Sequence, residues 1–335
     1  MTENINYDPS RREFLSRVGK AGIATAGCSV AAYLLYDPTG PRPGAGAEDL
    51  VTLADFSVPQ KAGQTISIVQ GADRVKTADK AIDLLGGIQR FVKQGEVVAI
   101  KPNVAFASPP MLGATAHPEL VAEVVRLCYK GGAKKVIVTD NPINDPASCF
   151  TLSGIGKAVS QAGAKVVLPK DHLFKQTTLA GGKLIKNWPI FFEPFKKVDR
   201  LIGIAPVKHH HRAGASMSMK NWYGLLGGRR NVFHQDINTI IAELAMMVKP
   251  TLVILDATLV MMTNGPTGGS VSDLKRADTM IASTDCVAAD SYGCSLLGLT
   301  VSDLPYLAKA EKAGAGTTDY KSLKPKLAVI QESQP

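Results

Sequence analysis

From residue 65 onward the chain alternates short runs of β-branched and apolar residues with segments of helical periodicity. Most of the short runs are apolar at consecutive positions, which is typical of strands in a sheet covered on both faces. Strand–helix–strand repetition favours parallel pairing, because a crossover through a helix returns the chain in the same direction. The pattern therefore predicts an α/β fold that is Rossmann-like, with a mostly parallel, doubly wound sheet and helices on both faces.

The expected elements can be placed along the chain from this periodicity. Strands are expected at 65–70, 96–101, 135–139, 165–168, 200–205, 251–256, 279–282 and 326–330. Helices are expected at 77–93, 118–130, 153–161, 236–248, 285–297 and 303–313. The second of these helices has the clearest signals, with His117 at its N-cap, Pro118 at its first position and Gly131-Gly132 at its end.

The first 47 residues carry the features of an export signal. Arg11-Arg12 precede an apolar segment at 18–36, and Ala45-Gly46-Ala47 follow it. A charged, an apolar and a small-residue region in this order indicate a cleaved signal peptide. Paired arginines followed by Phe and Leu resemble the twin-arginine class, which implies export of the folded protein to the periplasm by the twin-arginine translocase. We expect 1–47 to be signal peptide and linker, with no membrane span in the mature chain.

A second interpretation of this segment is a lipid anchor. Thr25-Ala26-Gly27-Cys28 loosely resembles a lipoprotein cleavage box, which would leave a lipid on Cys28. The residue three places before that cysteine is usually large and aliphatic, and here it is Thr25. Cleavage after Ala47 is therefore the favoured interpretation.

The length and net charge of the remaining residues limit the number of domains and the kind of partner that we expect. Residues 48–335 are long enough for a single α/β domain, or for two closely packed α/β halves at about 60–195 and 196–335. The whole chain has a net charge of +9, and five basic against four acidic residues in 1–47 leave +8 for the rest. This surplus favours anionic partners. Scattered basic residues, few aromatic residues and export together exclude nucleic acid as the expected partner.

Four cysteines lie beyond the signal, and they match no cofactor pattern. None of them stands in a C-x-x-C, and their spacings fit neither an iron–sulfur cluster nor a zinc site. An oxidising compartment is compatible with a disulfide, but the spacing does not identify a pair. They are Cys128, Cys149, Cys286 and Cys294.

Polar and charged residues follow five of the expected strands directly. Ligands of doubly wound sheets bind beyond the carboxyl ends of the strands, so we expect these residues to form a binding site. The five groups are Lys101-Pro102-Asn103, Asp140-Asn141, Lys208 to Gly214, Asp256 with the loop that begins Asn264-Gly265, and Asp285. From them we select Lys101, Asn103, Lys208, Asn264 and Gly265 as residues that bind a cofactor or substrate.

The run from Lys208 to Arg212 is the densest of these groups. In an extended segment His209 and His211 point together and His210 points away. Neutral imidazoles could bind a metal, and Lys and Arg could bind an anion such as phosphate. A surface loop with its histidines bonded to backbone is the third interpretation. If a metal binds, we expect His209, His211 and His234 to be its ligands.

Lys220 and Asn221 stand in a second polar segment. Ser218 can cap a short helix whose first amides attract an anion, and a lysine so near a helix start is unfavourable unless an anion offsets it. Lys220 is therefore a candidate catalytic base or imine-forming amine, and Asn221 a candidate binding residue.

Two aspartates complete the candidate catalytic set. Asp140 and Asp256 each follow an apolar run and are candidates for acid/base or ligand roles, whereas Asp285 is better explained as a helix N-cap. The loop after Asn264 is neither a dinucleotide fingerprint nor a P-loop, and no G-x-S-x-G occurs. Nicotinamide binding, nucleoside triphosphate binding and α/β-hydrolase chemistry are thus unsupported.

Several of these strings, taken in order, resemble the domain-of-unknown-function 362 family. The likeness runs from about residue 66 to 319 and includes Lys101-Pro102-Asn103, Ala205 to His209, Met219-Lys220-Asn221, Asn264-Gly265-Pro266 and Ser283 to Asp290. The resemblance implies a Rossmann-like α/β fold and frequent company with iron–sulfur proteins. This chain departs from it in carrying no ferredoxin module and in having Asp256-Ala257 where the family tends to have Asp-Gly.

A shorter stretch is similar to the lactate racemase family. The order of His209 to Gly214, then Lys220, then His234 matches the order of basic and histidine residues there. The resemblance implies a nickel-pincer nucleotide held through a lysine and a histidine.

Together these observations lead to two functional expectations. The first is a periplasmic protein that binds an anionic cofactor or small molecule, a metal, or both, at the strand ends, in connection with periplasmic redox metabolism. The alternative is a non-catalytic accessory protein whose positive charge steers it to an acidic iron–sulfur or other redox protein.

Overall fold

The computed structural model describes residues 13–23 and 50–331. Residues 13–23 form a helix with exposed side chains. The paired arginines Arg11-Arg12, the alternative lipidation site Cys28 and the expected cleavage site after Ala47 lie outside the described residues. Within the described part of the chain, no helix is both long and apolar enough to cross a membrane.

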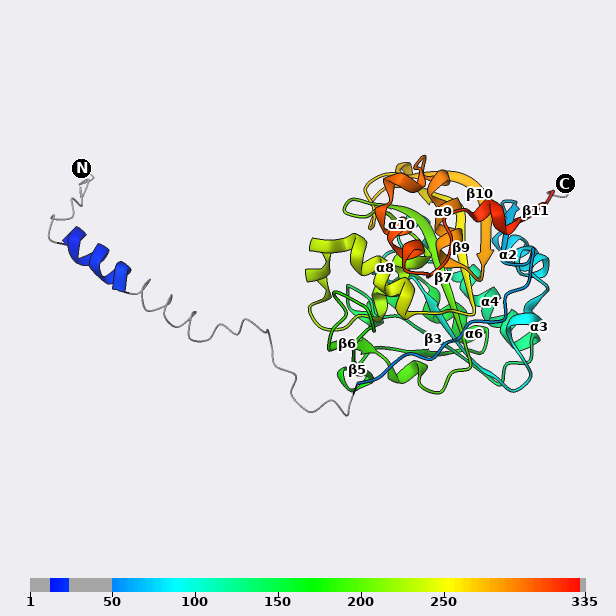
Figure 1. The fold of residues 1–335 in the computed structure, drawn as a ribbon, viewed down its shortest axis with the longest axis horizontal. Coiled ribbons are helices and arrows are strands. Elements are labelled where there is room, and N and C mark those ends of the chain that lie inside the picture. The colour runs from blue at the N-terminus through cyan, green and yellow to red at the C-terminus, as the bar shows by residue number, and fades with distance from the viewer. Residues whose placement is uncertain (1–12, 24–49, 332–335) are drawn as a thin grey trace, which may run out of the picture. The chain divides into compact units, whose positions relative to one another are not determined.

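One mixed sheet organises residues 66–329. Its strands run in the order β11-β1-β10-β9-β7-β2-β3-β4, and β8 pairs with β7 at one end (Figure 1). Five of the strand pairings are parallel, and β10 and β8 run against their neighbours. The strands are β1 (Ile66–Gln70), β2 (Val97–Pro102), β3 (Lys135–Thr139), β4 (Lys165–Val167), β7 (Arg200–His210), β8 (Gly214–Ser216), β9 (Leu252–Met261), β10 (Leu274–Ser283) and β11 (Lys326–Val329).

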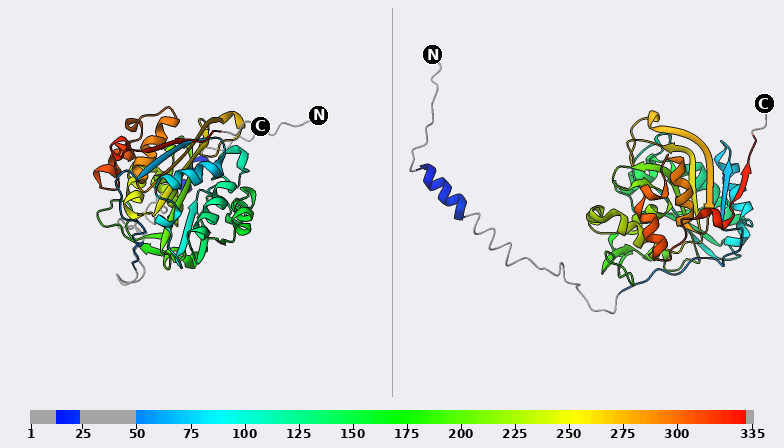
Figure 2. Two further views of the ribbon diagram at one scale, coloured as in Figure 1. Left: turned by 90° about the vertical axis from the view of Figure 1, so that its right-hand side faces the viewer. Right: turned by 45° about the horizontal axis from the view of Figure 1, so that its top comes forward.

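Helices cover both faces of this sheet, as Figure 2 shows. On one face pack α2 (Arg74–Leu84), α3 (Ile88–Phe91), α4 (Pro118–Lys130), α5 (Pro146–Leu152) and α6 (Ile155–Gln161). On the other pack α7 (Ser218–Asn221), α8 (Ile237–Met247), α9 (Cys286–Leu296) and α10 (Pro305–Lys312). Successive residues of each strand point alternately into these two cores; Ile254, for example, lies in one core and Leu255 in the other. The predicted α/β fold with a mostly parallel, doubly wound sheet is confirmed.

Several elements differ in extent from the expected ones. The strands β7, β9 and β10 are each longer than predicted, because their added residues pair with one another and with β8. The helix expected at 77–93 is divided at Gly86-Gly87, where both residues have positive φ and end α2. A separate hairpin of β5 (Phe174–Thr177) and β6 (Trp188–Phe191) was not predicted.

The direction of β10 corrects one of the five strand-end predictions. Ser283, the last residue of β10, pairs with Ile66, the first residue of β1. Asp285 therefore lies at the edge where the parallel strands begin, opposite the expected site. Its carboxylate accepts a hydrogen bond from the Ala288 amide at 2.9 Å and caps α9, as the N-cap interpretation predicted.

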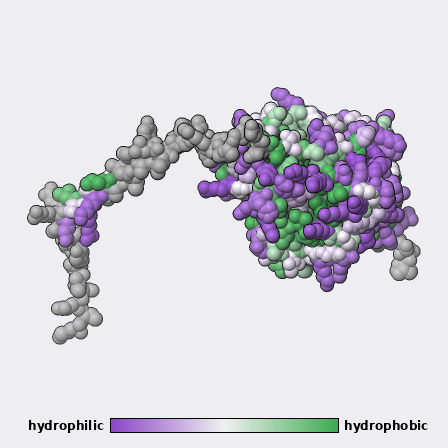
Figure 3. Space-filling model, turned by 90° about the horizontal axis from the view of Figure 1, so that it is seen from below, coloured by the Kyte–Doolittle hydropathy of each residue, from purple (hydrophilic) through white to green (hydrophobic). Residues whose placement is uncertain are grey.

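The four cysteines of residues 50–331 are free thiols with buried side chains. Burial raises the pKa of the Cys128 thiol to about 12 and that of the Cys294 thiol to about 11. These cysteines act as small apolar residues of the two cores. On the surface, Figure 3 shows hydrophilic side chains over much of one face, with hydrophobic ones between them.

Substitution of Gly203 tests how closely the second core packs on the sheet. A Cβ atom at Gly203, in β7, would lie 2.7 Å from Cη2 of Trp222, whose side chain is fully buried. We expect Gly203→Ala to lower the free energy of unfolding by about 1–3 kcal/mol, because the indole ring must move. Urea denaturation followed by tryptophan fluorescence measures the change. The matched control is Gly269→Ala, where a Cβ meets no atom within 4 Å; equal stability of the two variants would contradict the close packing.

Candidate functional site

A cavity of about 520 Å³ opens at the carboxyl edge of the parallel strands. Its walls come from the carboxyl ends of β2 and β7 and from the segments that follow β2, β3, β7 and β9, together with α7 and the turn Trp222–Leu225. Eleven of the twelve site residues selected from the sequence line it. They are Lys101, Asn103, Asp140, Lys208, His209, His211, Lys220, Asn221, His234, Asn264 and Gly265.

A buried ion pair forms the floor of this cavity. Nζ of Lys101 lies 2.7 Å from Oδ1 of Asp140, and the two side chains are 1% and 2% exposed. The Asp140 carboxylate also accepts hydrogen bonds from the amides of Val104 at 2.8 Å and Asn141 at 2.9 Å. Burial lowers the pKa of Lys101, and the charge of Asp140 opposes that shift. Asp140 thus holds Lys101 and two loops in place, with its oxygens already occupied.

Asn221 connects this ion pair to two strands. Its side-chain oxygen accepts a hydrogen bond from Lys101 Nζ at 2.9 Å, and its amide donates to the carbonyls of Lys101 at 3.1 Å and Ile204 at 3.2 Å. The neighbouring Gly224 leaves space for the pair. A Cβ atom there would overlap Oδ1 of Asp140 and lie 2.9 Å from Cε and Nζ of Lys101. A glycine is therefore required for the ion pair to form against this turn.

Lys208 is buried without a carboxylate partner among the described residues. Its Nζ donates to the carbonyls of Ala114 at 2.5 Å and Pro266 at 3.2 Å, and lies 5.2 Å above the ring centre of Phe106. Burial, and then the charge of Lys220, lower the pKa of Lys208 to about 7. Near neutral pH this amine therefore carries its charge only part of the time, and a bound anion would stabilise the charged form.

Lys220 is the third lysine of the cavity wall. Burial, and then the charge of Arg230, lower its pKa to about 8. Its Nζ lies 5.1 Å above the ring centre of Tyr223, a cation–π contact. Within the described residues this amine has no hydrogen bond and no ion pair, so its electron pair or its protons are available to a ligand.

We predicted from the sequence that the first amides of the helix near Lys220 attract an anion, and this prediction was wrong. The first amides of α7 do not face a ligand, because both oxygens of the buried Asp290 carboxylate occupy them. The Ser218 amide donates to Oδ1 at 2.8 Å and the Met219 amide to Oδ2 at 3.0 Å. Asp290, on α9, thus occupies the first amides of the helix, and burial raises the pKa of its carboxyl to about 7. Lys220 lies in the last turn of that four-residue helix.

The histidines after β7 bond mainly to backbone. Nδ1 of His209 accepts a hydrogen bond from the Gly265 amide at 3.1 Å, and Nδ1 of His211 lies 3.3 Å from the Gly265 carbonyl. Nδ1 of His210 accepts from the amides of Arg212 and Ala213, which assigns its ring proton to Nε2. His210 does not point away as expected: its ring stacks on His211 and on His234.

His234 is fixed by Tyr223. The Tyr223 hydroxyl donates to the Arg230 carbonyl, so Nδ1 of His234, 3.1 Å from that hydroxyl and 3.2 Å from the Asn231 carbonyl, must be the donor. This leaves an electron pair on Nε2 of the ring. Burial lowers the pKa of His234, which keeps the ring neutral at pH 7.

The arrangement of these histidines does not form a metal site. Among residues 13–23 and 50–331, no three His, Cys, Asp or Glu side chains are placed to share a metal ion. Nδ1 of His209 and Nδ1 of His211 each lie within hydrogen-bonding distance of the Gly265 backbone. The metal interpretation therefore gains no support from this geometry, and the anion interpretation accounts for the lysines.

Arg230 and Tyr223 are wall residues that the sequence reasoning did not select. The Arg230 guanidinium donates to the carbonyls of Asn141 at 2.8 Å and Pro142 at 2.6 Å and pairs with no carboxylate in the described chain. For Arg230 the only signal in the sequence was the pair Arg229-Arg230 after Gly227-Gly228, a pattern that is also typical of a surface turn.

Asp256 is the one selected residue outside the cavity. The strand β9 continues through it to Met261, and its neighbours Leu255 and Ala257 point into the core on the α8 side. Asp256 therefore points to the α2 side, where Oδ2 lies 2.8 Å from Nε of Arg74. We predicted a strand end here because Asp256 follows the apolar run that stops at Leu255. The backbone pairing of β9 with β10 nevertheless continues to Met261.

Three comparisons place the chain among known proteins. The family model described as "Domain of unknown function (DUF362)" matches residues 98–295. Thylakoid-associated protein sll1697 of Synechocystis sp. (strain ATCC 27184 / PCC 6803 / Kazusa) is 25% identical over 250 residues, which cover 71% of this chain and 74% of that one.

Two solved structures show lower similarity. Lactate racemase apoprotein from Thermoanaerobacterium thermosaccharolyticum matches with a TM-score of 0.40 and 13% identity over 76% of this chain. A protein from Thermotoga maritima matches with a TM-score of 0.40 and 11% identity over 69% of this chain. The chain spans 60% of each of these two proteins, which is less than two thirds of their length.

Removing the charge of Asp140 tests the floor of the cavity. Asp140→Asn leaves the Lys101 ammonium buried without its counter-ion, so we expect a loss of about 3–5 kcal/mol in the free energy of unfolding, measured by urea denaturation. The matched control is Glu193→Gln, which removes the more exposed pair of Lys175 and Glu193 at 3.9 Å and should cost less than about 1 kcal/mol. Similar losses in both variants would show that the buried pair does not hold the site together.

Proposed function

The chain belongs to the DUF362 family, and we propose that its cavity binds a small anionic organic compound, a carboxylate or a phosphate. One observation carries this proposal. The cavity wall holds four basic side chains, Lys101, Lys208, Lys220 and Arg230, against the single carboxylate of Asp140. That carboxylate is already paired with Lys101, so the other three cations lack a counter-charge in the wall. An anion bound between them would supply it.

The burial of these cations favours a small ligand over a protein partner. A docking protein that steers to an acidic surface needs basic side chains that reach the surface. Lys101 and Lys208 are each 1% exposed, so neither can contact another protein. Both line the cavity, so their charges act at short range on a small anion bound there. The accessory-protein alternative therefore has less support than ligand binding.

Lys220 is the group that we assign to chemistry on the bound ligand. Unlike Lys101 and Lys208, its amine has no hydrogen-bonding partner in the described chain, and its pKa of about 8 makes a neutral fraction available near pH 7. In the neutral form the amine can accept a proton from the ligand. His234, neutral and with an electron pair on Nε2, is the second group of the wall that can do so.

We further propose that the protein acts in the periplasm after export by the twin-arginine translocase, beside an iron–sulfur or other redox protein. The support is Arg11-Arg12 with the apolar and small-residue regions that follow. A periplasmic partner of this kind would use exposed charges outside the cavity.

The affinity for anions should fall as pH rises. Anion binding needs protonated lysines, and the pKa values of Lys208 and Lys220 are about 7 and about 8. Both amines are charged at about pH 6 and both are neutral at about pH 9, so we expect the affinity for sulfate, whose charge is constant over this range, to fall at least about tenfold. Calorimetric titration across this range measures it.

Two variants test which lysine causes each decrease in sulfate affinity as the pH rises. Lys208→Met should remove the decrease near pH 7 and weaken sulfate binding at low pH. Lys220→Met should leave a single decrease, at a pH above 7, because the Lys220 charge no longer lowers the pKa of Lys208. The control Lys326→Met changes an exposed lysine on β11 and should leave the profile unchanged. A sulfate affinity independent of pH, or equal in all four proteins, would rule out the proposed anion site.

Export can be tested independently of ligand binding. Substituting both arginines, Arg11→Lys and Arg12→Lys, keeps the charge and removes the pattern that the twin-arginine translocase requires. We expect the double variant to remain in the cytoplasm while the parent chain is recovered from the periplasm, as fractionation and immunoblotting would show. The control is the substitution of Arg17→Lys in the same segment, which should not change export. Equal periplasmic recovery of the double variant would contradict the proposed route.

A further inference from the structure

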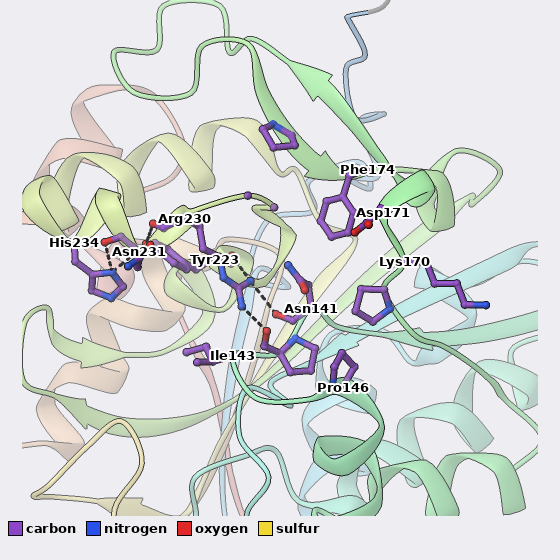
Figure 4. Close-up of a pocket in the computed structure, with 15 residues that line it drawn as sticks. Asn141, Ile143, Pro146, Lys170, Asp171, Phe174, Tyr223, Arg230, Asn231 and His234 are labelled. Carbon is purple, nitrogen blue, oxygen red and sulfur yellow. Dashed lines mark hydrogen bonds between the residues drawn. The ribbon is translucent and has the colours of Figure 1, made fainter. Parts of the chain in front are cut away.

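A second, more open cavity of about 650 Å³ adjoins the first (Figure 4). Its walls come from the segments after β3 and β4, from the β5–β6 hairpin and from residues 223–234. The two cavities share five wall residues, so a molecule can occupy both. The shared residues are Asn141, Ile143, Tyr223, Arg230 and His234. We call the basic cavity the inner cavity and this one the outer cavity.

The wall of the outer cavity differs in chemistry from that of the inner one. Its apolar residues are mostly rigid rings, and they are Pro142, Ile143, Pro146, Pro169, Phe174 and Pro189. Proline and phenylalanine rings present flat C–H and π surfaces that lose little conformational freedom when a ligand packs on them. The same wall also holds Lys170, Asp171 and Asn231, so a flat group would pack on these rings between polar side chains.

Phe174 is held in place by its neighbours. Its ring stacks on Phe191 across the β5–β6 hairpin, with ring centres 5.1 Å apart. Gly227 packs against the same ring, where a Cβ atom would lie 2.6 Å from Cδ1 of Phe174. The Gly227 amide donates a hydrogen bond to the Pro189 carbonyl at 2.8 Å, which keeps Gly227 close to the Phe174 ring. The Phe174 ring is thus positioned before a ligand binds.

Arg230 lies where the two cavities meet. In Figure 4 its guanidinium stands between His234 on one side and Phe174 on the other, and dashed lines join it to the carbonyls of the segment that begins at Asn141. Those carbonyls fix its position without neutralising its charge. An acidic group at this junction would contact Arg230 while the rest of the molecule extends toward Phe174.

We propose that the outer cavity binds the planar ring of an aromatic anion whose acidic group occupies the inner cavity. This inference rests on the proposed anion binding and adds the class of ligand to it. The inner cavity alone would accept any small anion. The outer cavity selects among anions, because an aliphatic anion of the same charge leaves the rings of its wall uncovered.

Pairs of probes with matched acidic groups test the inference on the complete protein. The pairs are benzenesulfonate with methanesulfonate, and benzoate with acetate, all of which are fully or almost fully ionised at about pH 6. We expect the aromatic member of each pair to bind about tenfold more tightly, measured by calorimetric titration at that pH. Phe174→Leu, which keeps an apolar side chain but removes the ring, should abolish most of that preference and leave the affinity for methanesulfonate unchanged.

The control Tyr320→Leu removes an aromatic ring remote from both cavities and should keep the preference. If the aromatic and aliphatic members bind equally to the unmodified protein, or if Phe174→Leu keeps the full preference, the outer cavity does not bind the ring. In those outcomes anion binding itself still stands. If none of the four probes binds, the proposed anion site fails and this inference fails with it.

Discussion

The buried ion pair of Lys101 and Asp140 is the contact on which the rest of the site depends. It joins the ends of β2 and β3, and through Asn221 it connects both to α7 and β7. Removing two charges from water is costly, and a buried pair is often no more stabilising than an apolar one. Two backbone amides donate hydrogen bonds to Asp140, and the side-chain oxygen of Asn221 accepts one from Lys101, which offsets that cost. Its consequence is geometric: it fixes the floor of a cavity whose remaining cations have no counter-ion in the wall.

Those remaining cations make folding less favourable. Burial lowers the pKa of Lys208 to about 7 and that of Lys220 to about 8, so folding destabilises their charged forms. In the unfolded chain both would titrate near their ordinary value, and this difference makes folding less favourable as pH falls from about 10 toward 7. The anion that we propose would oppose this effect, because it would stabilise the protonated amines. Its binding would therefore be coupled to proton uptake.

Much of the fold could be predicted from the sequence, and the errors have physical causes. Apolar runs between helical segments identified eight strands, and the rule that ligands bind at the carboxyl edge brought Lys101, Asp140 and Lys208 together correctly. The same rule failed for Asp285, because periodicity does not reveal that β10 runs antiparallel. It failed for Asp256, because this residue interrupts an apolar segment that resumes at Ala257, and the strand pairing continues through it. Arg230 was missed because its role comes from backbone carbonyls of a distant loop, and no local pattern encodes such a contact.

The placement of the two cavities also bears on how the chain is divided. The inner cavity takes Lys101 and Asp140 from the first half of the chain, and Lys208, Lys220 and Gly265 from the second. The outer cavity likewise combines Phe174 with Arg230. The sheet explains this, since β2 of the first half pairs with β7 of the second, and β7 pairs with β9. Neither half has all the residues of the proposed site, because the cations for the acidic group come from both halves and the apolar rings of the outer cavity come from the first. We therefore propose that residues 48–335 act as a single domain, in which the ligand binds along the line where the halves join.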